Sequence, residues 1–325
     1  MSHNSALSAT FDPYEYLQIV LNPDGTITRK HSLLSGAAAT SDPSHHTIPS
    51  KDISINQSNN VGVRIYLPRQ ALDSSSTVKL PLIVYYHGGG FIIGNVAASV
   101  FHNFCSNMAL EFPAVVLSVK YRLAPEHRLP AAYDDAMEAL HWIRTTQEVW
   151  LKEYADLSSC FLMGTSAGGN IVYHVGLRAA SQIDELFPLK VKGLILHQPF
   201  IGGVKRTESE LRLMNNPVFP ACVSDLMWDL SLPHGVDRDH EYCNPTVGDE
   251  SKALDQIRVQ EWKVVITGWN GDPMIDRQIE LVKMIEQKGV KVKSHFCDGG
   301  YHGIDIVDAT KMKDLQIILK NFVLS

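Results

Sequence analysis

From residue 61 onward, short apolar runs alternate with longer segments whose apolar positions recur every three or four residues. The short runs predict buried strands and the longer segments predict helices. Met274–Lys288 is a clear helical case, because Ile275, Ile279, Val282 and Ile285 fall on one face. The predicted strands are Val61–Leu67, Leu80–Tyr86, Ala114–Val119, Cys160–Gly164, Val191–His197, Lys263–Gly268 and Val292–Cys297, and the predicted helices are Ala98–Glu111, Ala131–Trp150, Ala167–Ser181, Met274–Lys288 and Lys311–Phe322. This alternation predicts an α/β fold with a mostly parallel central sheet and helices on both faces.

Two segments depart from the alternation. The first fifty residues hold a short amphipathic stretch at Phe11–Leu21, a strong turn signal at Asn22–Gly25 and a loop-like stretch from Ser35 to Ser50. The stretch from about 200 to 244 mixes prolines and acidic residues with large apolar side chains. Because an insertion after the carboxyl end of a strand lies over the active site of such a fold, we interpret 1–50 and about 200–244 as a cap or lid. An extra pair of surface helices is the alternative for the insertion.

The composition is that of a globular protein in solution. The chain has 325 residues, 45% hydrophobic and 20% charged, which suits a single domain over residues 1–325 with a large core. Its net charge of −6 argues against nucleic acid or an anionic membrane as a partner. Residues 1–10 lack the apolar core of a signal peptide, and no apolar run is long enough to span a bilayer. These features predict a cytoplasmic protein.

The cysteines also indicate a reducing compartment. Their number is odd, none forms a C-x-x-C pair, and Cys160 falls in a predicted core strand. We therefore expect free thiols rather than disulfides or a zinc site. No metal or organic cofactor is implied, since the pair His45 and His46 fits a solvated loop. The absence of an association motif leads us to expect a monomer.

Two glycine-rich motifs supply the candidate chemistry. Gly164-Thr165-Ser166-Ala167-Gly168 is a G-x-S-x-G elbow, in which glycines let the chain turn sharply and expose a serine hydroxyl. His87-Gly88-Gly89-Gly90 is a loop whose unhindered N–H groups can surround a developing oxyanion. Both motifs follow predicted strands directly, at the sheet edge where open α/β folds place their active sites. A nucleophile and an oxyanion cradle together predict acyl transfer.

A serine nucleophile needs a base, which in α/β-hydrolases lies downstream, after an acid. His174 lies on the helix that leaves the elbow, and His295 lies inside a strand. His302 sits in the loop 298–303, just past the last predicted strand, where it can reach the serine. We therefore predict His302 as the base. The downstream histidines are His174, His197, His234, His240, His295 and His302.

The acid is expected after the strand Lys263–Gly268. Asp272 lies in the loop that follows, directly before Pro273, whereas Asp276 falls in the first turn of the next helix. An acid in a first turn is already explained by the helix dipole, so we favour Asp272. An N-cap role would also explain Asp272.

The chain resembles the hormone-sensitive-lipase group of α/β-hydrolases, and most closely its plant carboxylesterases, from about residue 60 to the end. The motifs that carry this resemblance are His87–Phe91, Tyr121–His127, Gly164–Gly169, Asp272–Pro273 and His302–Gly303. The resemblance implies that Ser166 is the nucleophile, His302 the general base and Asp272 its orienting acid. It also implies an oxyanion hole formed by the backbone N–H groups of Gly88, Gly89 and Ala167. The Tyr121–His127 motif carries no evident chemistry, and we interpret it as a structural turn.

The predicted function is hydrolysis of short- to medium-chain carboxylic esters, small molecules, through an acyl-enzyme. Two alternatives share the fold. One is a gibberellin receptor, which resembles these esterases but has lost the catalytic histidine. The other is a dehydratase that uses the same base to abstract a proton. One departure from the group is Thr165, where Asp is common; since it lies outside the triad, we expect it to modulate the site only.

Overall fold

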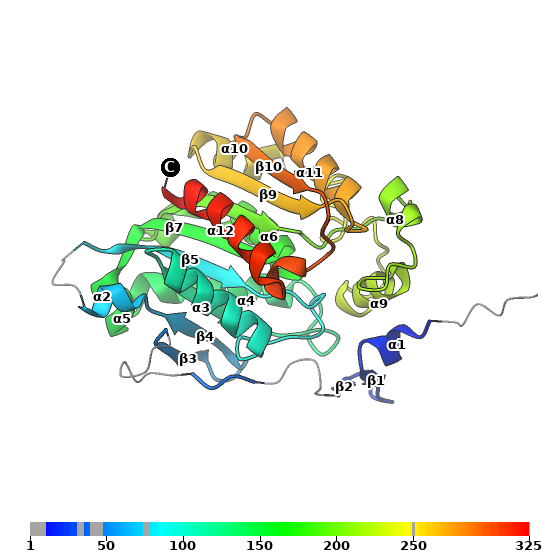
Figure 1. Cartoon of the computed structure of the whole chain (residues 1–325), viewed down its shortest axis with the longest axis horizontal. Helices are drawn as coiled ribbons and strands as arrows, with labels where there is room; N and C mark the ends of the chain where they lie inside the picture. The colour runs from blue at the N-terminus through cyan, green and yellow to red at the C-terminus, as the bar shows by residue number, and fades with distance from the viewer. Residues whose placement is uncertain (1–10, 31–35, 40–47, 74–77, 249–250, 325) are drawn as a thin grey trace, which may run out of the picture.

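A central sheet of eight strands, in the order β10-β9-β8-β7-β5-β6-β4-β3, organises the chain (Figure 1). The computed structural model describes residues 11–30, 36–39, 48–73, 78–248 and 251–324. Five of the seven strand pairings are parallel, whereas β3 and β4 pair antiparallel with each other, as do β4 and β6. The strands of this sheet are β3 (Ser50–Asn56), β4 (Val61–Tyr66), β5 (Leu80–Tyr86), β6 (Val115–Lys120), β7 (Ala155–Thr165), β8 (Val191–His197), β9 (Lys263–Trp269) and β10 (Val292–Cys297). The prediction of a mostly parallel α/β sheet is confirmed.

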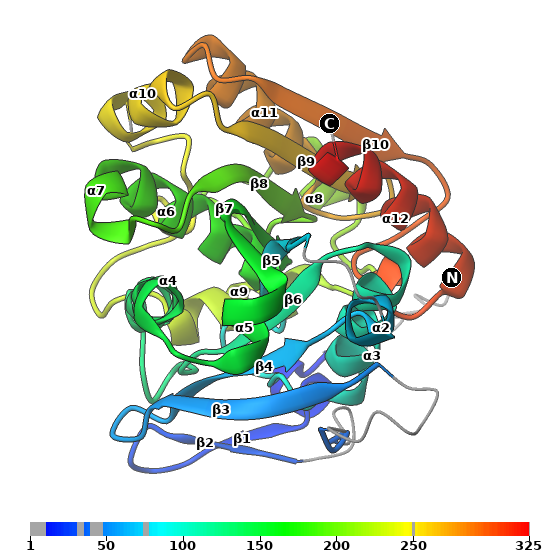
Figure 2. The same cartoon turned by 90° about the vertical axis from the view of Figure 1, so that its left-hand side faces the viewer.

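Helices cover both faces of this sheet, as Figure 2 shows. One face packs against α4 (Ala131–Thr145), α6 (Ala167–Ser181) and α10 (Ser251–Val259), and the other against α3 (Ser99–Glu111) and α12 (Ala309–Leu324). Strand side chains alternate between the two cores: Leu82, Val84 and Tyr86 of β5 join the first, and Ile83 and Tyr85 join the second. Both faces are therefore apolar, which explains why these strands are continuous hydrophobic runs in the sequence. The remaining helices are α1 (Pro13–Tyr16), α2 (Arg69–Asp73), α5 (Val149–Tyr154), α7 (Ile183–Leu186), α8 (Glu208–Arg212), α9 (Ala221–Ser231), α11 (Ile275–Gln287) and the 3₁₀ turn η2 (Ile304–Ile306).

The seven predicted strands are all present; β7 begins five residues before the predicted Cys160, and the other ends shift by at most one residue. The helix predicted over 131–150 is instead two helices, α4 and α5. Thr146 is extended at the end of α4, and the Glu148 carboxylate accepts the Leu151 N–H to start α5 afresh. Strand β3 was not predicted, because only alternate residues of this edge strand contact the core. Helix α10 was not predicted either.

The amphipathic stretch over 11–21 is helical only in its first part. Asp12 caps α1 by accepting the Tyr14 N–H, and the positive φ of 52° at Gln18 ends the helical path. The chain continues as a hairpin of β1 (Ile19–Leu21) and β2 (Ile27–Arg29), joined at the predicted turn around Gly25. The loop predicted from Ser35 to Ser50 lies largely outside the described residues.

The insertion over 200–244 contains α8 and α9, and α1 lies against α9 (Figure 1). The Tyr16 hydroxyl donates to the Val218 carbonyl, 2.6 Å away, just before α9 begins. The amino-terminal segment and the insertion thus pack together beside the carboxyl edge of the sheet. None of the helices in the described ranges is long and apolar enough to cross a membrane.

Candidate active site

Ser166 occupies a strained turn between β7 and α6. Its φ of 57° and ψ of −119° are unusual for a residue with a side chain. The turn depends on its glycines, because a Cβ on Gly168 would overlap the Tyr86 carbonyl and one on Gly164 would overlap the Gly168 carbonyl. The Ser166 N–H donates to the carbonyl of His197, at 2.9 Å, which ties the turn to the end of β8. This is the geometry expected of a nucleophile elbow.

His302 joins Ser166 to Asp272. Its Nε2 lies 2.9 Å from Ser166 Oγ, and its Nδ1 lies 2.8 Å from Asp272 Oδ2. The Asp272 carboxylate is fully buried and also accepts the Met274 N–H and the side-chain amide of Gln278. These bonds fix the carboxylate so that it can orient the imidazole. The structure therefore brings the three predicted residues into one hydrogen-bonded chain.

The rejected candidates lie elsewhere. Among the described residues, the Ser166 hydroxyl hydrogen-bonds to no other histidine. His174 on α6 stacks on Tyr133 of α4, and His295 is exposed on β10. Asp276 accepts the Ser209 N–H, at 2.7 Å, near the start of α8. Its carboxylate is therefore occupied in joining α11 to α8.

The glycine loop runs directly beside Ser166. An added Cβ on Gly88 would lie 3.1 Å from Ser166 Cβ and 3.0 Å from the Thr165 carbonyl oxygen. Gly89 and Gly90 have φ values of 111° and 59°, which other residues rarely adopt. Within the described part of the chain, the N–H groups of Gly88, Gly89 and Ala167 donate to no carbonyl or side chain. These three donors are available to an oxyanion.

The Tyr121–His127 motif supports this loop from behind. The Tyr121 hydroxyl donates to the His87 carbonyl, at 2.7 Å, and the two rings stack with centroids 4.4 Å apart. Burial lowers the pKa of His87 to about 4, so this imidazole is neutral at physiological pH. The Ala124 N–H donates to the Phe91 carbonyl at 2.9 Å. The structural role expected of the motif is thus the support of the glycine loop.

Arg29 is a second support of the glycine loop, and no motif in the sequence points to it. Its Nε donates to the Ile92 carbonyl at 2.6 Å, and one Nη donates to the Ala124 carbonyl at 2.8 Å. The same guanidinium pairs with Glu126 at 2.7 Å. The hairpin β1–β2 is therefore fastened to the loop that follows the glycines. Arg29 is distant in sequence from Ile92, Ala124 and Glu126, so only the folded chain reveals these contacts.

Aromatic side chains of the insertion lie between the glycine loop and His302. Phe219 stacks on the His302 imidazole, and its ring also meets Phe200 edge-on. Phe200 stacks on Trp228, with centroids 4.4 Å apart, and Trp228 contacts Phe91. These rings make the surroundings of the site strongly apolar.

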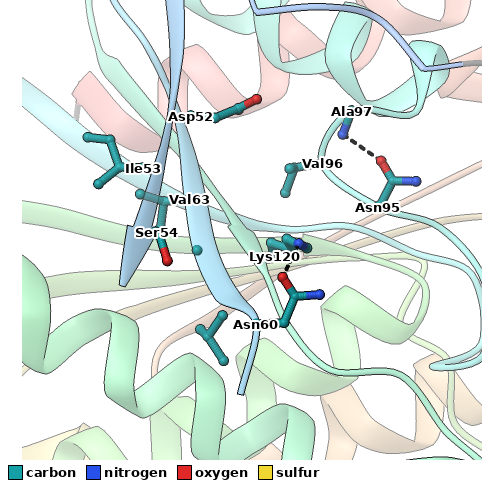
Figure 3. A pocket seen from close by; sticks show the side chains of 11 residues that line it. Asp52, Ile53, Ser54, Asn60, Val63, Asn95, Val96, Ala97 and Lys120 are labelled. Carbon is teal, nitrogen blue, oxygen red and sulfur yellow. Dashed lines mark hydrogen bonds between the residues drawn. The ribbon is translucent and has the colours of Figure 1, made fainter. Parts of the chain in front are cut away.

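A separate cavity of about 520 Å³ lies along β3, β4 and β6 (Figure 3). It contains no residue of the Ser166–His302–Asp272 chain. Its polar groups bond to neighbours: Lys120 donates to Asn60, the Asn95 side chain accepts the Ala97 N–H, and Asp52 pairs with Arg64. Among the described residues, no group of three His, Cys, Asp or Glu side chains is placed to hold a metal ion.

Comparison with known proteins gives a consistent result. The family model described as "alpha/beta hydrolase fold" matches residues 83–306. Carboxylesterase 20 of Arabidopsis thaliana is 54% identical, with 97% of each chain covered. The 3-O-acetylpapaveroxine carboxylesterase CXE1 of Papaver somniferum is 45% identical over 97% of this chain and 98% of its own. Gibberellin receptor GID1C of Arabidopsis thaliana is more distant, at 35% identity over 85% of this chain and 80% of its own. Among solved structures, an esterase of Pyrobaculum calidifontis shares the fold, with a TM-score of 0.70, 24% identity and coverage of 87% of this chain and 88% of its own.

Proposed function

Since the chain belongs to the α/β-hydrolase family, we propose that it is a serine carboxylesterase of the plant type. The observation that carries the proposal is the unbroken hydrogen-bonded chain from Ser166 through His302 to Asp272. A serine hydroxyl is a weak nucleophile at neutral pH, and this arrangement supplies the base and the orienting acid that it needs.

The reaction proceeds in two halves. Ser166 Oγ attacks the ester carbonyl while His302 Nε2 takes its proton, and Asp272 stabilises the imidazolium that forms. The tetrahedral oxyanion accepts hydrogen bonds from the backbone N–H groups of Gly88, Gly89 and Ala167. His302 then protonates the departing alcohol, which leaves an acyl group on Ser166. Water, activated by the same imidazole, releases the carboxylic acid and restores the serine.

The substrates are short- to medium-chain carboxylic esters. The rings of Phe219, Phe200 and Trp228 favour an apolar acyl or alcohol group near the serine. Residues 1–50 and about 200–244 act as a cap around this region within a single domain. The Tyr16–Val218 hydrogen bond between the two segments supports this assignment for their described parts. The rest of the first fifty residues, 1–10, 31–35 and 40–47, is outside the described ranges.

We assign the protein to the cytoplasm as a monomer. All five cysteines are free thiols in the folded chain, and three of them are buried. Thiols of this kind suit a reducing compartment. Light scattering of the purified protein would test the monomer, and a fluorescent fusion would test the location.

The function is tested by hydrolysis of p-nitrophenyl acetate and butyrate. We expect turnover in the wild type and a loss of at least about 10³-fold in Ser166→Ala and His302→Ala. Asp272→Asn should lose a similar amount, whereas Asp276→Asn, which removes a carboxylate that joins α8 to α11, should stay within a few-fold of wild type. A folded wild type without esterase activity would overturn the proposal. Binding of a small apolar acid would then indicate a receptor, and release of water from a substrate would indicate a dehydratase.

A further inference from the structure

The residues of the loop that carries His302 restrict its backbone conformation only weakly. It runs from the end of β10 to η2 and contains Gly299 and Gly303, both with positive φ. Glycine lowers the cost of changing backbone conformation, so the position of the imidazole depends on contacts from outside the loop. His302 must nevertheless stay within hydrogen-bond distance of Ser166 for proton transfer.

Asn270 and Gly271 bond to the start of this loop, at Asp298 and Gly300, whereas Gln198 bonds to it on both sides of His302. Its side-chain nitrogen donates to the Tyr301 carbonyl at 3.1 Å, and its side-chain oxygen accepts the Gly303 N–H at 2.7 Å. The residue is fully buried. One side chain therefore bonds to the residue before the histidine and to the residue after it, using both ends of its amide.

The backbone at this position indicates that the amide is needed. Gln198 has a φ of 45°, in the left-handed region that favours glycine. This conformation is strained for a glutamine, and the surrounding structure must offset that strain. Its own N–H donates to the Thr267 carbonyl at 2.8 Å, which fixes the residue between the ends of β8 and β9.

The same short segment also holds the nucleophile. The Ser166 N–H donates to the carbonyl of His197, and the Phe200 N–H donates to the Ser166 carbonyl, each at 2.9 Å. Residues 197–200 thus bond to Ser166 through the backbone and to the His302 loop through the Gln198 side chain. Ser166 and the loop that carries His302 are therefore both hydrogen-bonded to the same segment at the end of β8.

We propose that Gln198 is a positioning residue that sets the distance between His302 Nε2 and Ser166 Oγ. It touches neither the substrate nor the reacting atoms; it acts through the backbone of Tyr301 and Gly303. This inference rests on the proposed esterase function, but the placement of His302 can be measured without turnover.

The first test replaces the amide by a group of similar size. Gln198→Met keeps the volume but removes both hydrogen bonds. We expect kcat for p-nitrophenyl butyrate to fall by about 10- to 100-fold with KM within about threefold, because a misplaced base slows proton transfer more than binding. Gln316→Met on α12 is the matched control for loss of a buried glutamine, and it should retain wild-type kcat. Thermal unfolding of each variant checks the fold.

The pH dependence of kcat in Gln198→Glu distinguishes a positioning role of the amide from a role in stability alone. A carboxylate can accept the Gly303 N–H but cannot donate to the Tyr301 carbonyl, whereas the protonated acid can do both. We therefore expect kcat of Gln198→Glu relative to wild type to rise by about tenfold from pH 8 to pH 5.5, since burial next to a carbonyl raises the pKa of the new acid. The titratable groups around the loop in both proteins are Asp272, His302, His197 and Asp305, so kcat is compared as the ratio to wild type at each pH.

The placement of His302 is measured directly by ¹H–¹⁵N spectra of the histidine-labelled protein, assigned with His302→Ala. The ring signals of His302 should broaden or shift in Gln198→Met and remain unchanged in Gln316→Met. If the folded Gln198→Met protein keeps both kcat and these ring signals, the proposal is wrong. If the wild type shows no esterase activity, the esterase assignment fails by itself, and the ring signals alone decide whether Gln198 positions His302.

Discussion

The aromatic ring of Phe219 lies against the imidazole of His302, with centroids 4.8 Å apart and 27° between the planes. Phe219 belongs to the insertion over 200–244, whereas His302 belongs to the loop after β10. The ring shields one side of the base from water and restricts its rotation. The insertion therefore contributes to the environment of His302 as well as covering it.

Removal of the Phe219 ring should lower the activity that depends on His302. We expect Phe219→Ala to lower kcat/KM for p-nitrophenyl butyrate by about tenfold, since a stacked aromatic pair contributes about 0.5–1.5 kcal/mol beyond its buried area. Phe219→Leu keeps an apolar side chain over the imidazole but lacks the ring, so its kcat/KM should lie between those of the wild type and Phe219→Ala. Phe187→Ala is the control, because Phe187 is 67% exposed and remote in sequence from the site. Equal kcat/KM in folded Phe219→Ala and wild type would contradict the expectation.

The space at Gly88 provides a second prediction. Its φ is not in the left-handed region, so a side chain there is opposed by space rather than by backbone strain. A Cβ would press on Ser166 and the Thr165 carbonyl, and the branches of valine would enter the region of the oxyanion. We expect Gly88→Val to lose about 10²–10³-fold in kcat and Gly88→Ala to lose less, with both variants folded. Circular dichroism and kcat of both variants test this, and near-normal turnover in Gly88→Val would remove Gly88 from the site.

Most of the fold could be predicted because its strands are buried on both faces. Runs such as Leu80–Tyr86 are apolar at nearly every position, so their ends are visible without knowledge of the neighbours. The three residues of the hydrogen-bonded chain could also be chosen from the sequence: they are Ser166, His302 and Asp272. Each lies in the turn or loop that follows a predicted strand, and parallel strands bring their carboxyl ends to one edge of the sheet.

The remaining parts depend on contacts between distant segments. Gln198 follows a predicted strand just as Asp272 does, but nothing in the sequence says that its amide meets Tyr301 and Gly303. Arg29 lies on the short strand β2, and two of its partners are carbonyl groups, which carry no sequence signal. Residues of this kind hold a site in place without taking part in a motif.

Arg29 gives the third prediction. Its replacement by Met removes the bonds to the Ile92 and Ala124 carbonyls and leaves the apolar stem in place. We expect Arg29→Met to lower kcat/KM by about 3- to 30-fold by loosening the loop next to the oxyanion donors. Arg178→Met is the matched control, because Arg178 is similarly exposed and pairs with Asp134 at the surface, where an ion pair contributes little. The expectation is wrong if the two variants have the same kcat/KM.

The fourth prediction concerns stability in acid. Burial lowers the pKa of His87 to about 4 and that of His174 to about 3, whereas an unfolded histidine titrates near 6.5. Below pH 6.5 the unfolded chain therefore binds more protons at these two positions than the folded chain. Their contribution to stability is fully present above about pH 6.5 and is lost progressively as the pH falls toward 4.

Each pKa unit of difference corresponds to about 1.4 kcal/mol, so each histidine destabilises the fold by a few kcal/mol near pH 4. Urea titrations between pH 7.5 and pH 4.5 measure the free energy of unfolding. As the pH falls below about 6.5, this free energy should decrease by about 1.4 kcal/mol per pH unit for each of the two histidines, in addition to the contributions of other titrating groups. His174→Gln should reduce that slope by about one proton, because a glutamine between Tyr133 and Tyr242 cannot take up a charge. His295→Gln, on the exposed face of β10, should leave the slope almost unchanged. An unaltered slope in folded His174→Gln would show that burial of a neutral imidazole on α6 is not a source of the acid sensitivity.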